Sequence, residues 1–220
     1  MTDKNPENKN LDLKIFLRTI LSPTLIFILL LFSFWVFALP TMRTNLRDSK
    51  KMMIKELTST AWDLIDNYNK RVERNELSIY DAQRRVKNRL KNLRYGPEGK
   101  NYFWIIDTIP RMVMHPYVQE LEGQDLSTYQ DSKGNKLFQK MVSKCREQES
   151  GFVNYSWQWK DMPERIEPKV SYVKIYSPWQ WIIGTGLYLN EVNQKIDDIT
   201  RSANKFFIIF GIIGLIFTIS

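Results

Sequence analysis

The chain has 220 residues, 43% of them hydrophobic and 13% aromatic, which is enough for one sizeable domain or two small ones with an apolar core. Its formal net charge of +8 raises the question of nucleic-acid binding. However, the basic residues of segment 71–94 alternate with Glu73, Glu76 and Asp81, and no DNA- or RNA-binding motif accompanies them. We therefore expect no nucleic-acid partner.

An uncharged apolar stretch near the N-terminus, residues 20–40, is about as long as a helix needs to cross a bilayer. A cleaved signal peptide is the alternative, since Val36 and Ala38 are small residues of the kind that precede a cleavage site. The apolar run exceeds the usual length of the hydrophobic region within a signal peptide. The pattern therefore favours an uncleaved transmembrane helix that follows a cytoplasmic segment, residues 1–19.

The C-terminal stretch, residues 206–220, is again free of charge but too short for a full span. It predicts the start of a second transmembrane helix within residues 205–220. Residues 41–204 then form a domain held at both ends by the membrane. Basic residues lie on both sides of the first span, so charge alone does not orient the chain.

Two helices are predicted at the start of this domain. Apolar residues recur at three- and four-residue steps, the period of one helical stripe: Leu46, Met53, Leu57, Ala61, Leu64, Ile65, Tyr68 and Val72. Ser78 is a candidate N-cap for a second helix, Ile79 to about Leu93, and Gly96 with Pro97 ends it.

From Lys100 onward the period changes from helical to alternating, which is typical of strands. A helix, Lys136 to about Glu147, interrupts the strands, and residues 190–205 return to a helical pattern. Five antiparallel strands are predicted, at residues 101–107, 111–115, 151–159, 169–177 and 179–189. The pattern indicates an α+β fold with helix packed on one face of the sheet.

Five blocks carry a family resemblance, in this order: "LRYGPEGKNYFWIID", "MVMHP", "LEGQDLSTYQDSKGNKLF", "GFVNYSWQW" and "PKVSYVKIYSPWQWIIGTGLY". Together they resemble bacterial single Cache domains of the second type, over about residues 42–204. These are extracytoplasmic sensor modules of chemoreceptors, sensor histidine kinases and cyclic-dinucleotide enzymes. The resemblance implies a PAS-like sheet behind a long N-terminal helix, a periplasmic position, and a pocket for small organic acids.

A pocket for a short carboxylate needs positively charged hydrogen-bond donors and an apolar wall. Arg94 stands just before the first predicted strand, where the family has an arginine, and its planar fork suits a carboxylate. The alternative is one more solvated arginine. Tyr102 and Trp104 share one face of that strand and offer a hydroxyl donor and a flat wall, or serve simply as core aromatics.

The only histidine, His115, precedes a proline. Pro116 restricts His115 to extended geometry, and alternation places His115 on the same face as Val113. The resemblance puts this His-Pro pair at the pocket, so His115 is expected to donate to an anion there, with purely structural bonds as the alternative. Because histidine titrates near neutral pH, binding through His115 would depend on pH.

Further pocket residues come from the later strands. Tyr155 and Trp157 share one face of the third strand. The block containing Lys169 and Tyr172 resembles the family segment whose lysine and tyrosine approach the ligand. In the last strand, the glycines at positions 184 and 186 are expected to allow close approach of a helix.

No catalytic constellation is visible, because one histidine and one cysteine, Cys145, provide neither a nucleophile with its base nor a four-ligand zinc site. We expect no cofactor, no metal and no enzyme activity in this chain, although a kinase, cyclase or methyl-accepting output could follow Ser220. The favoured hypothesis is the ligand-binding sensor region of a membrane-bound bacterial signal-transduction receptor. It is expected to form a homodimer, to bind a small carboxylate or similar metabolite and to pass the signal through its transmembrane helices. The alternative is a ligand-free, membrane-tethered dimerisation module, whose helices would pair through the stripe Leu46, Met53, Leu57 and Leu64.

Overall fold

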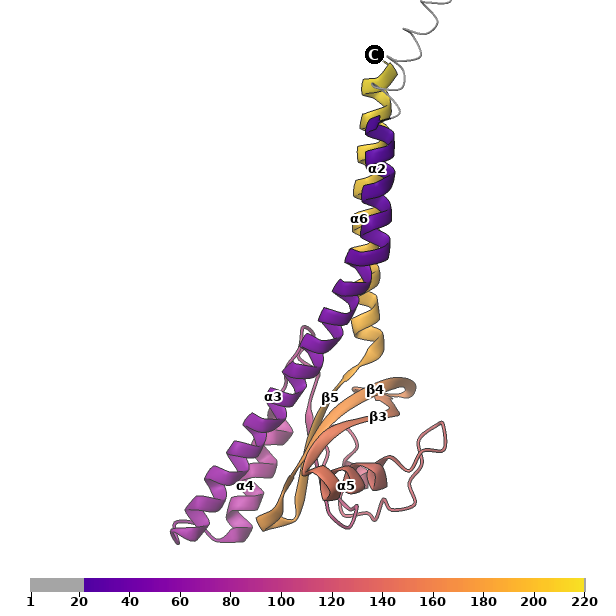
Figure 1. Cartoon of the computed structure of the whole chain (residues 1–220). Coiled ribbons are helices and arrows are strands. Elements are labelled where there is room, and N and C mark those ends of the chain that lie inside the picture. Colours follow the sequence, from indigo (N-terminus) through magenta and orange to yellow (C-terminus); the bar gives the residue numbers. More distant parts are fainter. Residues whose placement is uncertain (1–21, 220) are drawn as a thin grey trace, which may run out of the picture. The chain divides into compact units, whose positions relative to one another are not determined.

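The computed structural model describes residues 22–219 of the chain (Figure 1). The predicted cytoplasmic segment 1–19 and the first residues of the apolar stretch lie outside the described part. Contacts divide the chain into two compact units. The larger unit is Arg47–Val192, and the smaller one combines the helical segments before and after it.

A long helical segment leads from the smaller unit into the larger one. It begins with α2 (Ser22–Ser33), passes through a π-helical turn (Phe34–Ala38) and continues as α3 (Leu39–Glu73). The π-helical turn lies just before Pro40, whose ring removes a backbone donor from the helix, so the hydrogen-bond pattern changes at this point.

The structure supports only one of the two predicted membrane spans. Among residues 22–219, one helix is long and apolar enough to cross a membrane, Thr24–Glu73 near the N-terminus. The C-terminal helix α6 (Leu189–Ile219) carries the second apolar stretch, and within the smaller unit the rings of Phe207 and Phe210 contact that of Phe27. The second span stays a prediction.

The second predicted helix is confirmed within one residue as α4 (Ile79–Asn92). Ser78 is its N-cap, because the Ser78 hydroxyl accepts a hydrogen bond from the backbone N–H of Asp81 at 3.0 Å. Ala82, Val86 and Leu90 form the buried face of α4.

Replacing this N-cap, Ser78→Ala, is expected to lower the free energy of unfolding by about 1 kcal/mol, because the amide of Asp81 loses its acceptor. The matched variant Ser78→Asp retains an acceptor and is expected to stay within about 0.5 kcal/mol of the parent. Thermal unfolding of the chain in detergent, followed by circular dichroism, measures both. Equal losses in the two variants would show that the cap does not stabilise α4.

The five predicted strands are confirmed and form one sheet with every neighbouring pair antiparallel. The strand order across the sheet is β2-β1-β5-β4-β3. The strands are β1 (Phe103–Asp107), β2 (Met112–Met114), β3 (Ser150–Trp159), β4 (Met162–Tyr176) and β5 (Trp181–Tyr188). The last strand in the chain is therefore central, and all of its residues are buried.

Each face of the sheet has its own hydrophobic core. Ala61 and Ile65 of α3 pack with α4 against one face, while α5 (Leu137–Gln148) covers the other with Phe138 and Met141 (Figure 1). The expectation that helices cover only one face of the sheet is wrong. The apolar side of α5 also has to be buried, and it packs on the second face. The cavity described below lies on the face that α5 covers.

Candidate ligand-binding site

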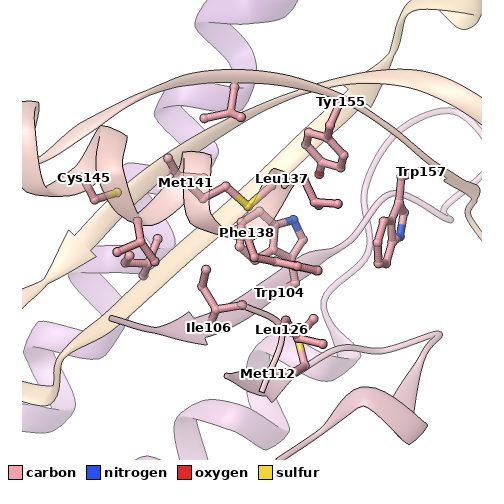
Figure 2. Packing of buried hydrophobic residues seen from close by; sticks show 14 of the residues in the cluster. Trp104, Ile106, Met112, Leu126, Leu137, Phe138, Met141, Cys145, Tyr155 and Trp157 are labelled. Atoms are coloured by element: carbon pink, nitrogen blue, oxygen red, sulfur yellow. The ribbon is translucent and has the colours of Figure 1, made fainter. Parts of the chain in front are cut away.

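A small cavity lies in the core between α5 and the sheet, with a volume of about 10 Å³. This is room for about one water molecule. Its lining residues come from the strands, from α5 and from the segment after β2: Tyr102, Trp104, Met112, His115, Leu137, Phe138, Met141, Tyr155 and Trp157. Five of the nine predicted site residues are among them, and Figure 2 shows how Trp104, Tyr155 and Trp157 gather near α5.

Two buried indole groups at the cavity lack hydrogen-bond partners. The Nε1–H groups of Trp104 and Trp157 have no acceptor among the described residues. The Trp157 indole lies near the Tyr102 hydroxyl, and the Trp104 indole lies near the Tyr155 hydroxyl. Neither pair has the geometry of a hydrogen bond. A buried donor without an acceptor is costly, so these two N–H groups are available to a ligand that accepts hydrogen bonds.

His115 is buried, and its own backbone neighbours fix its protonation. Its Nδ1 accepts hydrogen bonds from the backbone N–H groups of Tyr117 at 3.2 Å and Val118 at 2.9 Å. The proton of the neutral ring is therefore assigned to Nε2, which makes His115 a hydrogen-bond donor. Burial, then the charges of Lys169 and Arg94, hold the pKa of His115 well below 6.5. The predicted titration of His115 near neutral pH is therefore wrong.

The direction of His115 comes from an irregularity in the β1–β2 pairing. Ile105 pairs with Met114 but Ile106 pairs with Met112, so Val113 is an extra residue in β2. Alternation is lost at this bulge, and Val113 packs with the core on the helix α3 face while His115 lines the cavity on the other face. The prediction that His115 and Val113 share a face is wrong for this reason.

Lys169 is 2% exposed, and its side chain contacts Tyr102. Its Nζ donates to the Tyr102 hydroxyl at 2.9 Å and lies 4.1 Å from the Tyr102 ring centroid and 4.8 Å from that of Tyr188. Burial lowers the pKa of Lys169 from 10.5 to about 7; Glu191 raises it and Lys160 lowers it further. Lys169 does not line the cavity itself, and its link to the lining is the hydrogen bond to Tyr102.

Arg94 does not line the cavity. It follows the C-terminus of α4, and its guanidinium donates to the carbonyls of Lys91 at 2.6 Å and Leu93 at 2.9 Å. The guanidinium also lies 5.1 Å from the ring centroid of Tyr117. Arginine commonly binds the free carbonyls at a helix end in this way, so the predicted role of Arg94 as the carboxylate clamp is not supported.

Tyr172 and Pro116 also lie outside the cavity lining. The rings of Tyr172 and Phe152 meet edge to face with centroids 4.9 Å apart, and the Tyr172 hydroxyl donates to that of Ser150 at 2.8 Å. A spacing of three residues in a strand puts Lys169 and Tyr172 on opposite faces, which the sequence prediction overlooked. Pro116 is buried beside His115 and constrains its backbone.

Sequence reasoning missed several residues of the site. Ser171 shares the face of Lys169, is fully buried, and forms a hydrogen bond of 2.8 Å with the Tyr155 hydroxyl. The period of two along β4 could have identified it. The apolar wall on α5 was also missed, although its members recur at helical spacing: Leu137, Phe138 and Met141.

The two glycines of β5 make room for side chains of the site rather than for a helix. A Cβ atom on Gly184 would lie 2.3 Å from Cζ2 of Trp104. A Cβ atom on Gly186 would lie 2.2 Å from the Ser171 hydroxyl oxygen and 3.0 Å from Cε of Lys169. The expectation that a helix approaches these glycines is wrong.

A second buried lysine joins the sheet to the start of α6. Lys160, in the turn between β3 and β4, is 1% exposed and pairs with Glu98 at 2.8 Å and Glu191 at 2.5 Å. Its backbone N–H donates to the Tyr188 hydroxyl at 2.9 Å. Glu191 lies in the first turn of α6, so this ion-pair cluster fixes that turn to the sheet.

Among the described residues, no group of three or more histidine, cysteine, aspartate or glutamate side chains could hold a metal ion. Cys145 lies on the buried face of α5, and burial raises the pKa of its thiol to about 12. Its environment is that of a small apolar core residue.

Comparisons with known proteins agree with this fold. Over 162 residues the chain is 35% identical to the methyl-accepting chemotaxis protein McpP of Pseudomonas putida, and over 156 residues it is 28% identical to the sensor histidine kinase MctS of Rhizobium johnstonii. These alignments cover 73% and 70% of the chain. The chain spans only 29% and 32% of the length of these two relatives.

Two solved structures are similar in both sequence and fold. One, a periplasmic sensor domain of a chemotaxis protein, is 40% identical with a TM-score of 0.62, covering 64% of this chain and 96% of that one. The other, described as the structural basis for carboxylic acid recognition by a Cache chemosensory domain, is 34% identical with a TM-score of 0.62, covering 66% and 97%. Residues 46–202 match the family Single Cache domain 2, and the chain belongs to that family.

Proposed function

We propose that the chain is the sensor region of a membrane-bound bacterial signal-transduction receptor and that it binds a small organic acid. The observation that carries this proposal is the convergence of donors on one small cavity. Among the described residues the indole N–H groups of Trp104 and Trp157 have no acceptor, the neutral ring of His115 carries its proton on Nε2, and Lys169 donates to the Tyr102 hydroxyl. A carboxylate is an acceptor-only group that suits such a set.

The rest of the cavity suits a short carbon chain. Leu137, Phe138 and Met141 of α5 provide an apolar wall opposite the donors. With a volume of about 10 Å³, the cavity must widen before even a small acid can enter. The recognition of carboxylic acids by a 34% identical Cache domain supports this ligand class.

The proposed membrane topology follows the pattern of the sequence. Residues 1–19 are cytoplasmic, residues 20–40 form the first transmembrane helix, residues 41–204 form the periplasmic sensor domain, and residues 205–220 begin the second helix. The 40% identical periplasmic sensor domain supports the position of the middle segment. The output is proposed to be a kinase, a cyclase or a methyl-accepting region beyond Ser220, in line with the two longer relatives.

Signalling is proposed to run through the junction of β5 and α6. Tyr188 ends β5 and Leu189 begins α6, so a shift of the central strand acts directly on the helix. Widening of the cavity separates α5 from the sheet, and Lys160 with Glu191 holds the first turn of α6 against the same sheet. A ligand that favours one arrangement by about 1–3 kcal/mol is enough to shift the receptor between states.

Titration calorimetry of the full chain in nanodiscs, with acetate, propionate, pyruvate and larger acids, tests this function. At least one short monocarboxylate is expected to bind. Trp157→Phe removes one indole donor and is expected to weaken binding about tenfold, whereas Arg94→Ala is expected to leave the affinity within about twofold. No binding by any acid, or an equal loss in both variants, would contradict the assigned site.

A ligand-free dimerisation module remains the second candidate, because one helical stripe of α3 is only half-buried: Leu46, Met53, Leu57 and Leu64. A homodimer is compatible with both candidates. Mass photometry distinguishes them when combined with the calorimetry, because a chain that dimerises and binds no acid supports the second candidate alone.

A further inference from the structure

When Lys169 is protonated, no acid in the described part of the chain forms an ion pair with it. Lys169 is buried, its Nζ has one hydrogen-bond acceptor, the Tyr102 hydroxyl, and it forms no ion pair with any acid in residues 22–219. Lys160 provides the contrast within the same domain. It is buried to the same degree, yet it has two carboxylate partners, Glu98 and Glu191. An unpaired ammonium in a dry core is unfavourable.

The groups that face Lys169 do not supply the missing charge. Tyr102 and Tyr188 stay neutral at pH 7, since burial raises the pKa of Tyr102 well above 10 and that of Tyr188 to about 12. His115, across the cavity, is also neutral. Glu191, the one acid that acts on Lys169, is already paired with Lys160. The remaining polar neighbours on the strand faces are the Tyr155 and Ser171 hydroxyls.

We propose that Lys169 takes up a proton from solvent as a carboxylate enters the cavity, so that the ligand anion and a proton bind together. The proposal rests on the proposed function, because the ligand supplies the counter-charge that the protein lacks. The uncharged amine gains one proton and becomes an ammonium, and no bond between heavy atoms changes. The receptor then responds to the same concentration of acid more strongly as the periplasm becomes more acidic.

The low pKa of about 7 for Lys169 in the empty chain agrees with this geometry, because burial disfavours the charged form. A bound carboxylate raises that pKa. Below pH 7 the lysine is already protonated and little uptake is expected. Above pH 7, the binding of each ligand is expected to be accompanied by the uptake of about one proton. The affinity is then expected to fall about tenfold for each unit by which the pH rises.

The test is calorimetry of the full chain in nanodiscs with acetate and with propionate, from pH 6 to pH 9, in phosphate and in Tris buffer. Because these buffers differ in ionisation enthalpy, the difference in heat counts the protons taken up. Lys169→Arg keeps a permanent charge and is expected to abolish both the uptake and the pH dependence. The control Lys174→Arg, at a lysine of the same strand that stacks on Trp62, is expected to behave as the parent.

The possible outcomes separate this inference from the function on which it rests. Binding with the same heat in both buffers and a flat affinity between pH 7 and pH 9 would overturn proton uptake and leave the sensor function intact. Binding whose proton uptake persists in Lys169→Arg would assign the proton to another group and overturn the inference. No binding of either acid at any pH would overturn the proposed function and this inference with it.

Discussion

Lys169→Met is expected to stabilise the empty chain and to weaken carboxylate binding about 10- to 100-fold. The folded state lowers the pKa of Lys169 from 10.5 to about 7, so the unfolded state binds more protons between these values. Folding therefore carries the full penalty below pH 7 and loses it as the pH rises toward 10.5. Removing the lysine relieves a penalty of at most roughly 5 kcal/mol.

Thermal unfolding of the parent and variant in detergent at pH 6 and pH 9, followed by tryptophan fluorescence, measures this effect. The stabilisation by Lys169→Met is expected to be larger at pH 6 than at pH 9. Lys174→Met serves as the control, because Lys174 is only partly buried. A variant that is less stable than the parent at both pH values would show that Lys169 contributes to folding through its contacts with Tyr102 and Tyr188.

Gly184→Ala is expected to destabilise the chain by about 3 kcal/mol and to abolish ligand binding. The new Cβ atom would lie 2.3, 2.7 and 2.8 Å from three atoms of the Trp104 ring. The ring has little room to retreat, since Trp104 is 3% exposed and the cavity beside it holds about 10 Å³. Either the sheet must open at β5 or the ring must fill the site.

Gly151→Ala is the matched control for this strand glycine. Its Cβ atom would meet Cδ and Cγ of Lys144 at 2.6 and 2.8 Å, but this flexible and partly exposed side chain can move away. The expected cost is below about 1 kcal/mol. Urea unfolding in detergent compares the two variants. If Gly184→Ala unfolds at the same urea concentration as Gly151→Ala, the close packing of Trp104 on β5 does not determine stability.

The sequence predicted much of the fold because its periodicity is strong. Alternation predicted all five strands, and the cap at Ser78 placed the start of α4 at the correct residue. The strand β4 begins at Met162, whereas the sequence predicted a start at Lys169. The prediction began too late because the first residues of β4 are exposed and lack an apolar alternation. Pairing with β3 extends this strand, and such pairing cannot be read from one segment alone.

The site was predicted in part, and each error has a physical cause. Trp104, Tyr155 and Trp157 line the cavity, as the alternation along β1 and β3 suggested, and their contact with a ligand stays a prediction. Arg94 lies outside the cavity lining because its guanidinium binds the carbonyls at the end of α4, a partner that suits it as well as a carboxylate does. The state of His115 depends on two backbone N–H groups that reach its ring only after the chain turns at Pro116.

The central position of β5 has a consequence for the order in which the domain can be made. The hairpin of β3 and β4 and the pair of β1 and β2 share no edge, and β5 joins them. Until residues 181–188 emerge from the ribosome, the nascent chain can form only two separate strand pairs with exposed edges. Assembly of the sheet waits for β5, its last strand in chain order, which leaves these edges open to chaperones until β5 has been made.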